Sequence, residues 1–437
     1  MNETRTINKQ IFRLAIPNII SNFSVPLLGA VDTALMGRLE TEHYLGAVGI
    51  GGVLFSFIYW GFGFLRMATT GLVAQSYGKR DHLECGFLLL RGLSLSVIIG
   101  FFLLIFQWLI VDISFYLMST SLEVEELGRM YFHIRIYAAP AVLCLLVFHG
   151  VFLGLQNAHY PMILTVSINV INIVLNILFV KVYGMKVEGV ALATVIAQYI
   201  GLLLAIILFR MKYSFVLQNW NVKKIFAIHK LRRFIGISND IFIRTLCLVF
   251  SNAYFTAKSA ALSDTYLAIN TILLQYINLM SYAIDGFAFA VESMIGKYKG
   301  EGNLQGIRNS ITQIFIFGFI FSGLFSFIFL FYGNRSLHLF TDKEDLILLT
   351  QPYLIWIIVA PLINLAAYIW DGVYLGATAS KSLRNSMIVA MVLFLCSVYV
   401  LAPYGNHGLW GALTILLVIR GVILTLMAPR SLFKVDK

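Results

Sequence analysis

The chain has 437 residues, of which 59% are hydrophobic and only 12% are charged, whereas about a quarter of an ordinary soluble domain is charged. This composition excludes a soluble globular enzyme, a disordered chain and a small secreted module held together by disulfides. The net charge is +11 at pH 7, but the basic residues do not alternate with aromatic residues on a polar face, so we expect no nucleic-acid partner. The mean hydropathy of +0.84 predicts a polytopic membrane protein.

Apolar runs that reach the roughly 20 residues needed to cross a bilayer recur along the whole chain. They are unbroken rather than alternating, which argues against a β-barrel. The first six predicted spans cover residues 12–37, 44–76, 86–111, 127–155, 159–181 and 188–210. The second six cover residues 234–257, 266–297, 307–333, 348–377, 385–403 and 408–429. The predicted fold is an all-α integral membrane protein with twelve transmembrane helices.

Lysine and arginine are distributed unevenly between the two ends of these spans. Loops and span ends on the side of the N-terminus carry 21 of the 32 basic residues, and those on the other side carry seven. Because basic loops stay in the cytoplasm, we expect a multi-pass protein of the inner (plasma) membrane with both termini cytoplasmic. The longest polar stretch divides the chain into an N-terminal six-helix lobe (1–211), a cytoplasmic basic linker (212–233) and a C-terminal six-helix lobe (234–437).

The two halves repeat at an offset of 222 residues. Gly150 and Gly154 correspond to Gly372 and Gly376, and Tyr44 corresponds to a tyrosine at position 266. Six spans per half give both halves the same orientation, so the two pseudo-symmetric bundles are related by an axis along the membrane normal. This plan is typical of transporters and predicts a substrate path between the lobes.

Asp32 is the most informative charged residue inside a span. It lies in the outer half of span one with no basic residue within one turn. Loss of solvation disfavours the ionised carboxylate, so this group is suited to bind and release protons. Pro17 and Pro26 each remove a backbone hydrogen bond from the same helix and allow it to bend. The alternative is a structural carboxylate that caps a helix or bridges to another span.

Polar side chains also gather in spans five and six. Asn172 and Asn176 are four residues apart and therefore share a helix face, and Thr194 lies in the next span. Their oxygens could hold a carboxylate in a hydrogen-bond network or bind a small cation. The alternative is that they join helices within the lipid, as such residues often do.

The second half carries its own charged residues within spans. Asp285 and Glu292 are seven apart on one face of span eight, and Arg244 in span seven is a plausible counter-ion for one of them. Asp371 precedes the second copy of the repeated glycine motif. For these residues an ion pair needed for assembly and a role in coupling or substrate contact both stay open. Arg66 in span two faces the same choice between structural pairing and substrate steering.

Several motifs in order resemble the MATE (multidrug and toxic compound extrusion) transporters over essentially the whole chain. The resemblance rests on residues 31–37 (VDTALMG) after a proline-bent start, 75–78 (QSYG) and 150–157 (GVFLGLQN). Residues 64–72 (FLRMATTGL), 240–244 (DIFIR) and 285–292 (DGFAFAVE) are similar to the DinF-like branch in particular.

The resemblance implies a MATE/MOP-type fold of two six-helix bundles and an exporter, not an enzyme, that needs no cofactor. It expels cationic or amphipathic compounds while H⁺ or Na⁺ runs inward. The family's cation-responsive group matches Asp32, its bending proline matches Pro17, and its supporting polar residues match Asn172, Asn176 and Thr194. These four polar residues are also where Na⁺ could bind, and no firm metal site is expected.

One departure from the family favours protons. Many members have an aspartate where this chain has Asn176, so Asp32 is the single carboxylate that we place in this site. We therefore expect a proton-coupled antiporter of small lipophilic cations that works as a monomer in membrane lipid. The rival from the same superfamily is a flippase of lipid-linked precursors, with which Arg66 and Arg244 are compatible. A membrane enzyme is disfavoured because no HExxH motif, paired acidic motif or Ser/His/Asp set occurs at one interface.

Overall fold

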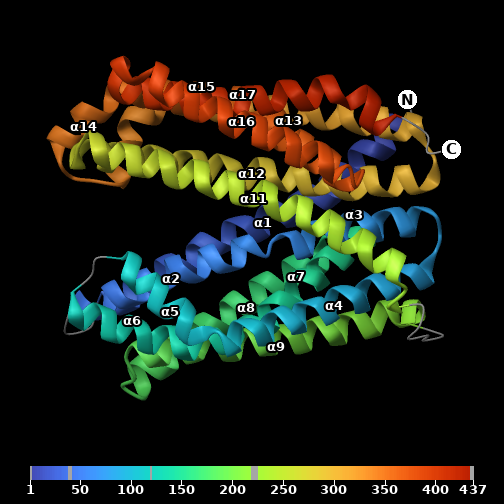
Figure 1. Ribbon diagram of the computed structural model, residues 1–437, viewed down its shortest axis with the longest axis horizontal. Helices are drawn as coiled ribbons and strands as arrows, with labels where there is room; N and C mark the ends of the chain where they lie inside the picture. The colour runs from blue at the N-terminus through green and yellow to red at the C-terminus, as the bar shows by residue number, and fades with distance from the viewer. Residues whose placement is uncertain (1, 38–41, 119–120, 218–224, 434–437) are drawn as a thin grey trace. The chain divides into compact units, whose positions relative to one another are not determined.

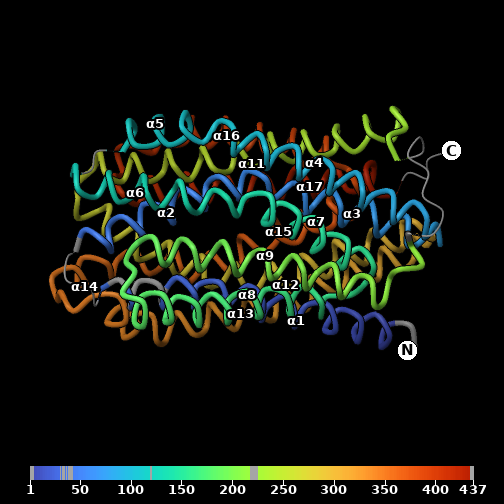
Figure 2. Tube along the Cα trace, turned by 90° about the horizontal axis from the view of Figure 1, so that it is seen from below, coloured from blue at the N-terminus to red at the C-terminus, as the bar shows by residue number. Residues whose placement is uncertain are grey.

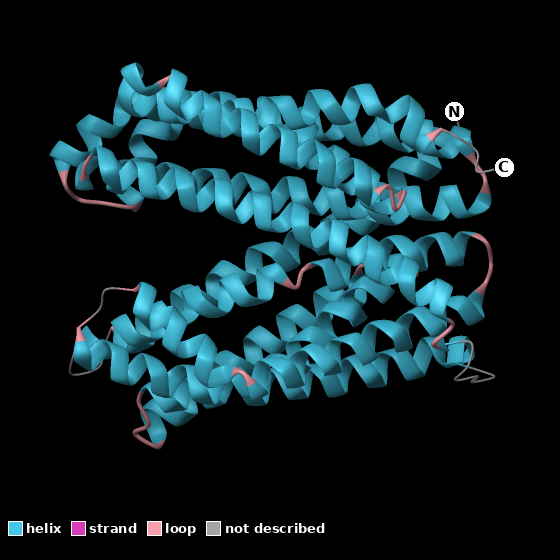
Figure 3. Ribbon diagram, in the orientation of Figure 1, coloured by secondary structure: helices cyan, strands magenta, loops and turns pink. Residues whose placement is uncertain are grey.

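The computed structural model describes residues 2–37, 42–118, 121–217 and 225–433 (Figure 1), although the side chains of a few of these, Asp32 among them, lie outside the description. The described residues form helices, turns and short loops, with no strand among them (Figure 3). Twelve described helical segments are long and apolar enough to cross a membrane, and each overlaps one predicted span. The prediction of an all-α protein with twelve membrane helices is confirmed.

The chain forms two compact units. One consists of residues 20–235, and the other of residues 1–19 together with residues 236–437. The helix α1 (Asn2–Met36) therefore contributes its first half to one unit and its second half to the other. The break near residue 235 lies beside the start predicted for the second lobe, whereas residues 1–19 group with the second half of the chain.

In the unit of residues 20–235 most of the strongest helix contacts join helices that are not consecutive in the chain. The strongest packing joins α3 to α7, α4 to α7, α8 to α9 and α2 to α6, and Figure 2 shows α8 and α9 side by side. Its elements after α1 are α2 (Glu42–Gly61), α3 (Phe64–Gly78), α4 (His82–Ile105), α5 (Gln107–Leu117), α6 (Leu122–Arg135), η1 (Ile136–Ala138), α7 (Ala139–Gly154), α8 (His159–Ile177), η2 (Leu178–Val182), α9 (Val187–Tyr213) and η3 (Ser214–Leu217).

The second unit is built around α15, which packs against α12, α13 and α17. Two further strong pairs are α16 with α17 and α12 with α13. The elements are α11 (Ile228–Leu262), α12 (Asp264–Glu301), α13 (Leu304–Ser336), η4 (Leu337–Leu339), α14 (Glu344–Thr350), η5 (Gln351–Tyr353), α15 (Leu354–Gly376), α16 (Ser380–Val400), η6 (Ala402–Tyr404) and α17 (Gly405–Leu432). Since α11 begins at Ile228, the last part of the predicted basic linker is helical, and residues 218–224 of that linker lie outside the described residues.

The repeated glycines explain why α7 and α15 pack so closely on their neighbours. A Cβ atom at Gly150 would overlap the carbonyl oxygen of Arg66 on α3, and one at Gly372 would overlap the carbonyl oxygen of Ala288 on α12. Gly150 and Gly372 are 222 residues apart, and so are Arg66 and Ala288. The two contacts therefore join equivalent positions of the repeat. The α3–α7 and α12–α15 contacts are thus the same close helix crossing, which only a residue without a side chain permits.

The two halves differ where span two of the first half is interrupted. Between α2 and α3 the backbone makes a turn at Phe62 and Gly63, with hydrogen bonds to Tyr59 and Trp60 in place of helical ones. Gly61 directly precedes this turn and Gly63 lies in it, and glycine is unfavourable inside a helix. The corresponding α12 continues unbroken from Asp264 to Glu301. At the repeat offset, Asp285 occupies the position of Gly63.

Candidate functional site

The helix α1 carries the residues predicted to bend and to bind protons. It is helical through both Pro17, which is buried, and Pro26, which is exposed. Asp32 is on this helix, four residues before its end, but its side chain lies outside the described residues. Bending at the prolines and titration of Asp32 stay predictions.

The polar residues predicted on spans five and six form one buried network. The Nδ2 of Asn172 donates a hydrogen bond to Oγ1 of Thr194 at 3.0 Å, and the Nδ2 of Asn176 donates to Oδ1 of Asn172 at 2.8 Å. Thr194 in turn donates to the carbonyl oxygen of Val190 at 3.0 Å. All three side chains are buried. The structure therefore brings together three of the four residues that the sequence assigned to cation coupling.

A further asparagine connects this face of α8 to α1. The Nδ2 of Asn169 donates to both the carbonyl oxygen and the hydroxyl oxygen of Ser24, each at 3.1 Å. Asn169 and Asn176 are seven residues apart and lie on the same face of α8. The polar face of α8 thus begins against α1 and continues into the buried network.

Three polar oxygens of the network could contribute to a small-cation site. They are the side-chain oxygens of Asn172, Asn176 and Thr194, and two of them already accept hydrogen bonds from neighbouring amides. A cation at these oxygens would compete with those hydrogen bonds. Among the described residues, no group of three or more His, Cys, Asp or Glu side chains could hold a metal ion.

The second unit contains a buried ionic cluster centred on Asp371. Its Oδ2 accepts hydrogen bonds from Nη2 of Arg244 on α11 and from Nη2 of Arg420 on α17. Asp371 is 8% exposed, Arg244 6% and Arg420 2%. Buried charges must be paired to offset their loss of solvation, and here one carboxylate serves two guanidinium groups. Arg420 had not been assigned to a site from the sequence.

The carboxylates of α12 belong to the same charged region. The ion pair that the structure shows for Arg244 is with Asp371, a pairing not drawn from the sequence. Even so, Asp285 and Glu292 lie close enough for their charges to act on Arg244, and Asp285 also acts on Arg420. Three acids and two arginines therefore gather where α11, α12, α15 and α17 meet.

Arg66 lies in the first unit, on α3, and is buried. Its charge acts on His149 of α7, which is half-buried. His149 occupies the repeat position of Asp371, so the same place in the two halves holds an imidazole in one and the centre of an ionic cluster in the other. Substrate steering by Arg66 stays a prediction.

Comparisons with known proteins agree with this fold. A family model described as MatE matches residues 17–178 and 241–401, and the two matched segments begin 224 residues apart, close to the repeat offset. The chain is 36% identical to the DNA damage-inducible protein F of Escherichia coli (strain K12), over 95% of this chain and 91% of that protein.

Two more distant similarities extend the comparison. The chain is 23% identical to a probable multidrug resistance protein NorM of Thermotoga maritima, over 79% of this chain and 75% of that protein. Among solved structures, the MATE transporter VcmN of Vibrio cholerae in the bent form aligns with a TM-score of 0.87 at 18% identity, covering 99% of this chain and 98% of that one. The predicted two-bundle transporter fold is thereby confirmed.

Proposed function

The chain belongs to the MatE family of multidrug and toxic compound efflux transporters, and we propose that it is a secondary antiporter that exports lipophilic cations in exchange for protons by alternating access. The observation that carries the proposal is the buried network of Asn172, Asn176 and Thr194. We further propose that the protein works as a monomer in the inner membrane, with both termini in the cytoplasm and no cofactor.

The helix register supports a place for Asp32 beside this network. Asn169 contacts Ser24, so residue 169 of α8 and residue 24 of α1 are level. Both helices run in the same direction (Figure 1), and each residue adds about 1.5 Å along the axis. Seven residues beyond Asn169 is Asn176, and eight beyond Ser24 is Asp32. We therefore expect the backbone of Asp32 at the level of Asn176.

A carboxylate at this level can couple the two transported species through its charge. When ionised, Asp32 attracts a cationic substrate; when a proton neutralises it, the attraction is lost and α1 is free to bend at Pro17 or Pro26. Release of the proton to the cytoplasm restores the substrate-binding form. The proton and the substrate can drive the conformational change only because the substrate prefers ionised Asp32 and the proton produces the neutral form.

The composition of the network favours H⁺ over Na⁺ as the coupling ion. With Asn176 in place of the family's frequent aspartate, Asp32 is the single acid assigned to the site. One carboxylate gives a Na⁺ site only half of the formal charge that two would give. A proton needs no ring of oxygen ligands, so the hydrogen bonds of Asn172 and Thr194 can persist through the cycle.

The ionic cluster around Asp371 is a weaker candidate for proton uptake. Its central carboxylate is shared by two guanidinium groups, which neutralise it. The charge of the cluster also helps to judge the rival function, a flippase of lipid-linked precursors. Such a flippase would need a strongly cationic site to bind a pyrophosphate. The three acids outnumber the two arginines here, which favours the export of cations.

Uptake of ethidium into energised inverted vesicles, which corresponds to efflux from the cell, tests the proposal. We expect Asp32→Asn to abolish efflux driven by a pH gradient while expression and thermal stability are kept. The matched control is Asp342→Asn, which removes one carboxylate from an exposed loop residue and should leave efflux unchanged. Normal pH-driven efflux by Asp32→Asn would overturn the assignment. Proton-independent flipping of a lipid-linked precursor would support the rival function.

A further inference from the structure

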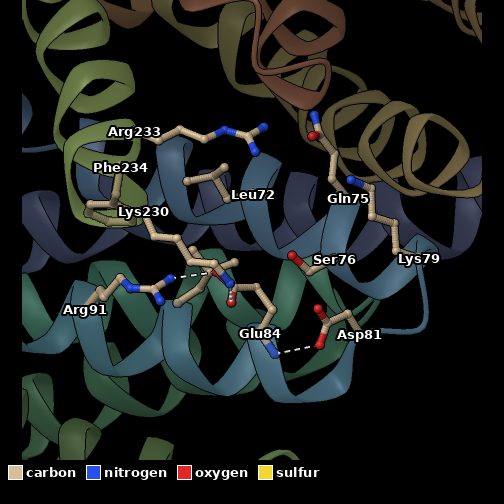
Figure 4. Close-up of a pocket in the computed structure, with 11 residues that line it drawn as sticks. Leu72, Gln75, Ser76, Lys79, Asp81, Glu84, Arg91, Lys230, Arg233 and Phe234 are labelled. Atoms are coloured by element: carbon tan, nitrogen blue, oxygen red, sulfur yellow. Dashed lines mark hydrogen bonds and ion pairs between the residues drawn. The ribbon is translucent and has the colours of Figure 1, made fainter. Parts of the chain in front are cut away.

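A charged pocket of about 180 Å³ lies where the end of α3, the start of α4 and the first turns of α11 meet (Figure 4). All of its lining residues fall between residues 72 and 234, inside one compact unit. Its acidic residues are Asp81 and Glu84, and its basic residues are Lys79, Arg91, Lys230 and Arg233. The pocket therefore carries a net charge of about +2, counting each side chain in its ordinary ionised form.

The two acids of the pocket are already engaged. Glu84 accepts a hydrogen bond from Nη1 of Arg91 at 2.7 Å and also pairs with Nζ of Lys230. Asp81 accepts a hydrogen bond from the backbone nitrogen of Glu84 at 3.0 Å, which caps the start of α4. Arg91 is itself buried and uses its Nε to bind the carbonyl oxygen of Ile225 at 2.5 Å. These contacts engage Arg91, Lys230, the carboxylate of Glu84 and one oxygen of Asp81.

Two cations of the pocket are left over. Lys79 and Arg233 are exposed, and within the described part of the chain neither forms an ion pair. Lys79 directly follows α3 and Arg233 lies on α11. In Figure 4 their charged ends point into the same part of the pocket, with the Gln75 amide near both and Ser76 farther along the wall toward Asp81. Two unpaired cations facing one space are a site for an anion with several oxygens.

We propose that this pocket binds a phosphate group, which Lys79 and Arg233 contact directly and to which the hydroxyl of Ser76 can donate a hydrogen bond. The pocket volume of about 180 Å³ is sufficient for a phosphate group, since a single water needs only about 15 Å³ on this measure. The distribution of Lys and Arg predicts that this end of the helices faces the cytoplasm. Basic pockets between membrane helices on that side bind the headgroups of anionic lipids, and a free phosphate has the same chemistry.

The chain offers a matched pair of double variants. Lys79→Gln with Arg233→Gln removes the two proposed contacts. Arg80→Gln with Arg232→Gln removes the same charge from the adjacent residues, which are exposed and do not line the pocket. Because all four side chains are exposed, we expect both double variants to keep the melting temperature of the unmodified protein when no ligand is present.

The experiment measures the melting temperature in detergent during titration with dihexanoyl phosphatidylglycerol, and separately with inorganic phosphate. Sodium chloride at matched ionic strength gives the background. Each lipid-facing cation contributes about a fivefold gain in affinity, so K79Q/R233Q should need roughly 25-fold more ligand for the same shift. R80Q/R232Q should respond as the unmodified protein does.

The comparison of the two probes shows whether the pocket binds a lipid headgroup or a free phosphate. The comparison of the two double variants shows whether the site exists. A response to the lipid that only K79Q/R233Q loses identifies a lipid headgroup, and a response to inorganic phosphate that only this variant loses identifies a free phosphate. Both results support the pocket. Equal responses of the two double variants to both probes, or no response above the salt background, would overturn it. None of these outcomes depends on the compound that is transported.

Discussion

Asp371→Asn is the substitution whose effect on stability can be worked out most fully. The change keeps the shape of the side chain and removes its charge. Arg244 and Arg420 then remain buried with no carboxylate between them. Removing one partner of a buried ion pair lowers the free energy of unfolding by about 3–5 kcal/mol, because the remaining charge is buried without water or a counter-ion. Asp285 and Glu292 are near enough to offset part of this loss, so we expect about 3 kcal/mol.

A second aspartate in the same unit gives the control. Asp240 accepts hydrogen bonds from Arg384 at 2.5 Å and from Ser380 at 2.8 Å. The side chain of Arg384 is 29% exposed, so water can solvate its charge when the carboxylate is removed. We therefore expect Asp240→Asn to cost only about 1 kcal/mol.

The free energy of unfolding can be compared by titrating each purified variant with sodium dodecyl sulfate in mixed micelles and following the loss of helical circular dichroism. The variant D371N/R420Q, which removes one of the two stranded cations, should recover part of the stability lost in D371N. If D371N were no less stable than D240N, or if the second substitution lowered stability further, the reasoning about a shared buried carboxylate would be refuted.

Three further predictions concern helix packing and the polar network. Gly376→Ala should lower stability by about 1–3 kcal/mol, since its Cβ would overlap the carbonyl oxygen of Glu292. Gly323→Ala, where nothing lies within 4 Å, should be neutral or raise stability by up to about 1 kcal/mol in the same unfolding assay. Asn172→Ala removes the hydrogen bonds to Asn176 and Thr194 and should cost about 1–3 kcal/mol and slow ethidium efflux, whereas unchanged stability would show that the network is not needed.

The sequence was sufficient for the architecture because lipid imposes simple rules. A helix must satisfy its own backbone and be apolar over about 20 residues, so twelve spans could be read directly. The same rules made polar residues within spans stand out, and Asn172, Asn176 and Thr194 do meet in the structure. Their meeting was predictable because two share a helix face and the third lies on the next helix.

Charge pairing was harder to predict because it depends on how each helix is rotated about its axis. Arg244 was matched to Asp285 or Glu292, and the charges of both do act on it. Its hydrogen bond to Asp371, 127 residues away, was not indicated by the sequence. Arg420 was visible as an arginine within a span, yet nothing in its own helix indicates the shared carboxylate. Hydropathy did not indicate the turn between α2 and α3 either, because the flanking glycines are apolar enough to leave the run unbroken.

Proton release on substrate binding tests the central claim, that one carboxyl group serves both the proton and the cation. Ethidium would be added to the purified protein in weakly buffered detergent solution near the pH at which Asp32 is half protonated, and the released protons followed with a pH-sensitive dye. Linkage requires that a cation which binds only the ionised form displaces about half a proton per bound molecule at this pH and closer to one at lower pH. It also requires that the affinity falls as the pH is lowered. The account predicts this release in the unmodified protein and none in Asp32→Asn. Equal release by the two proteins, or ethidium binding without any release, would contradict it.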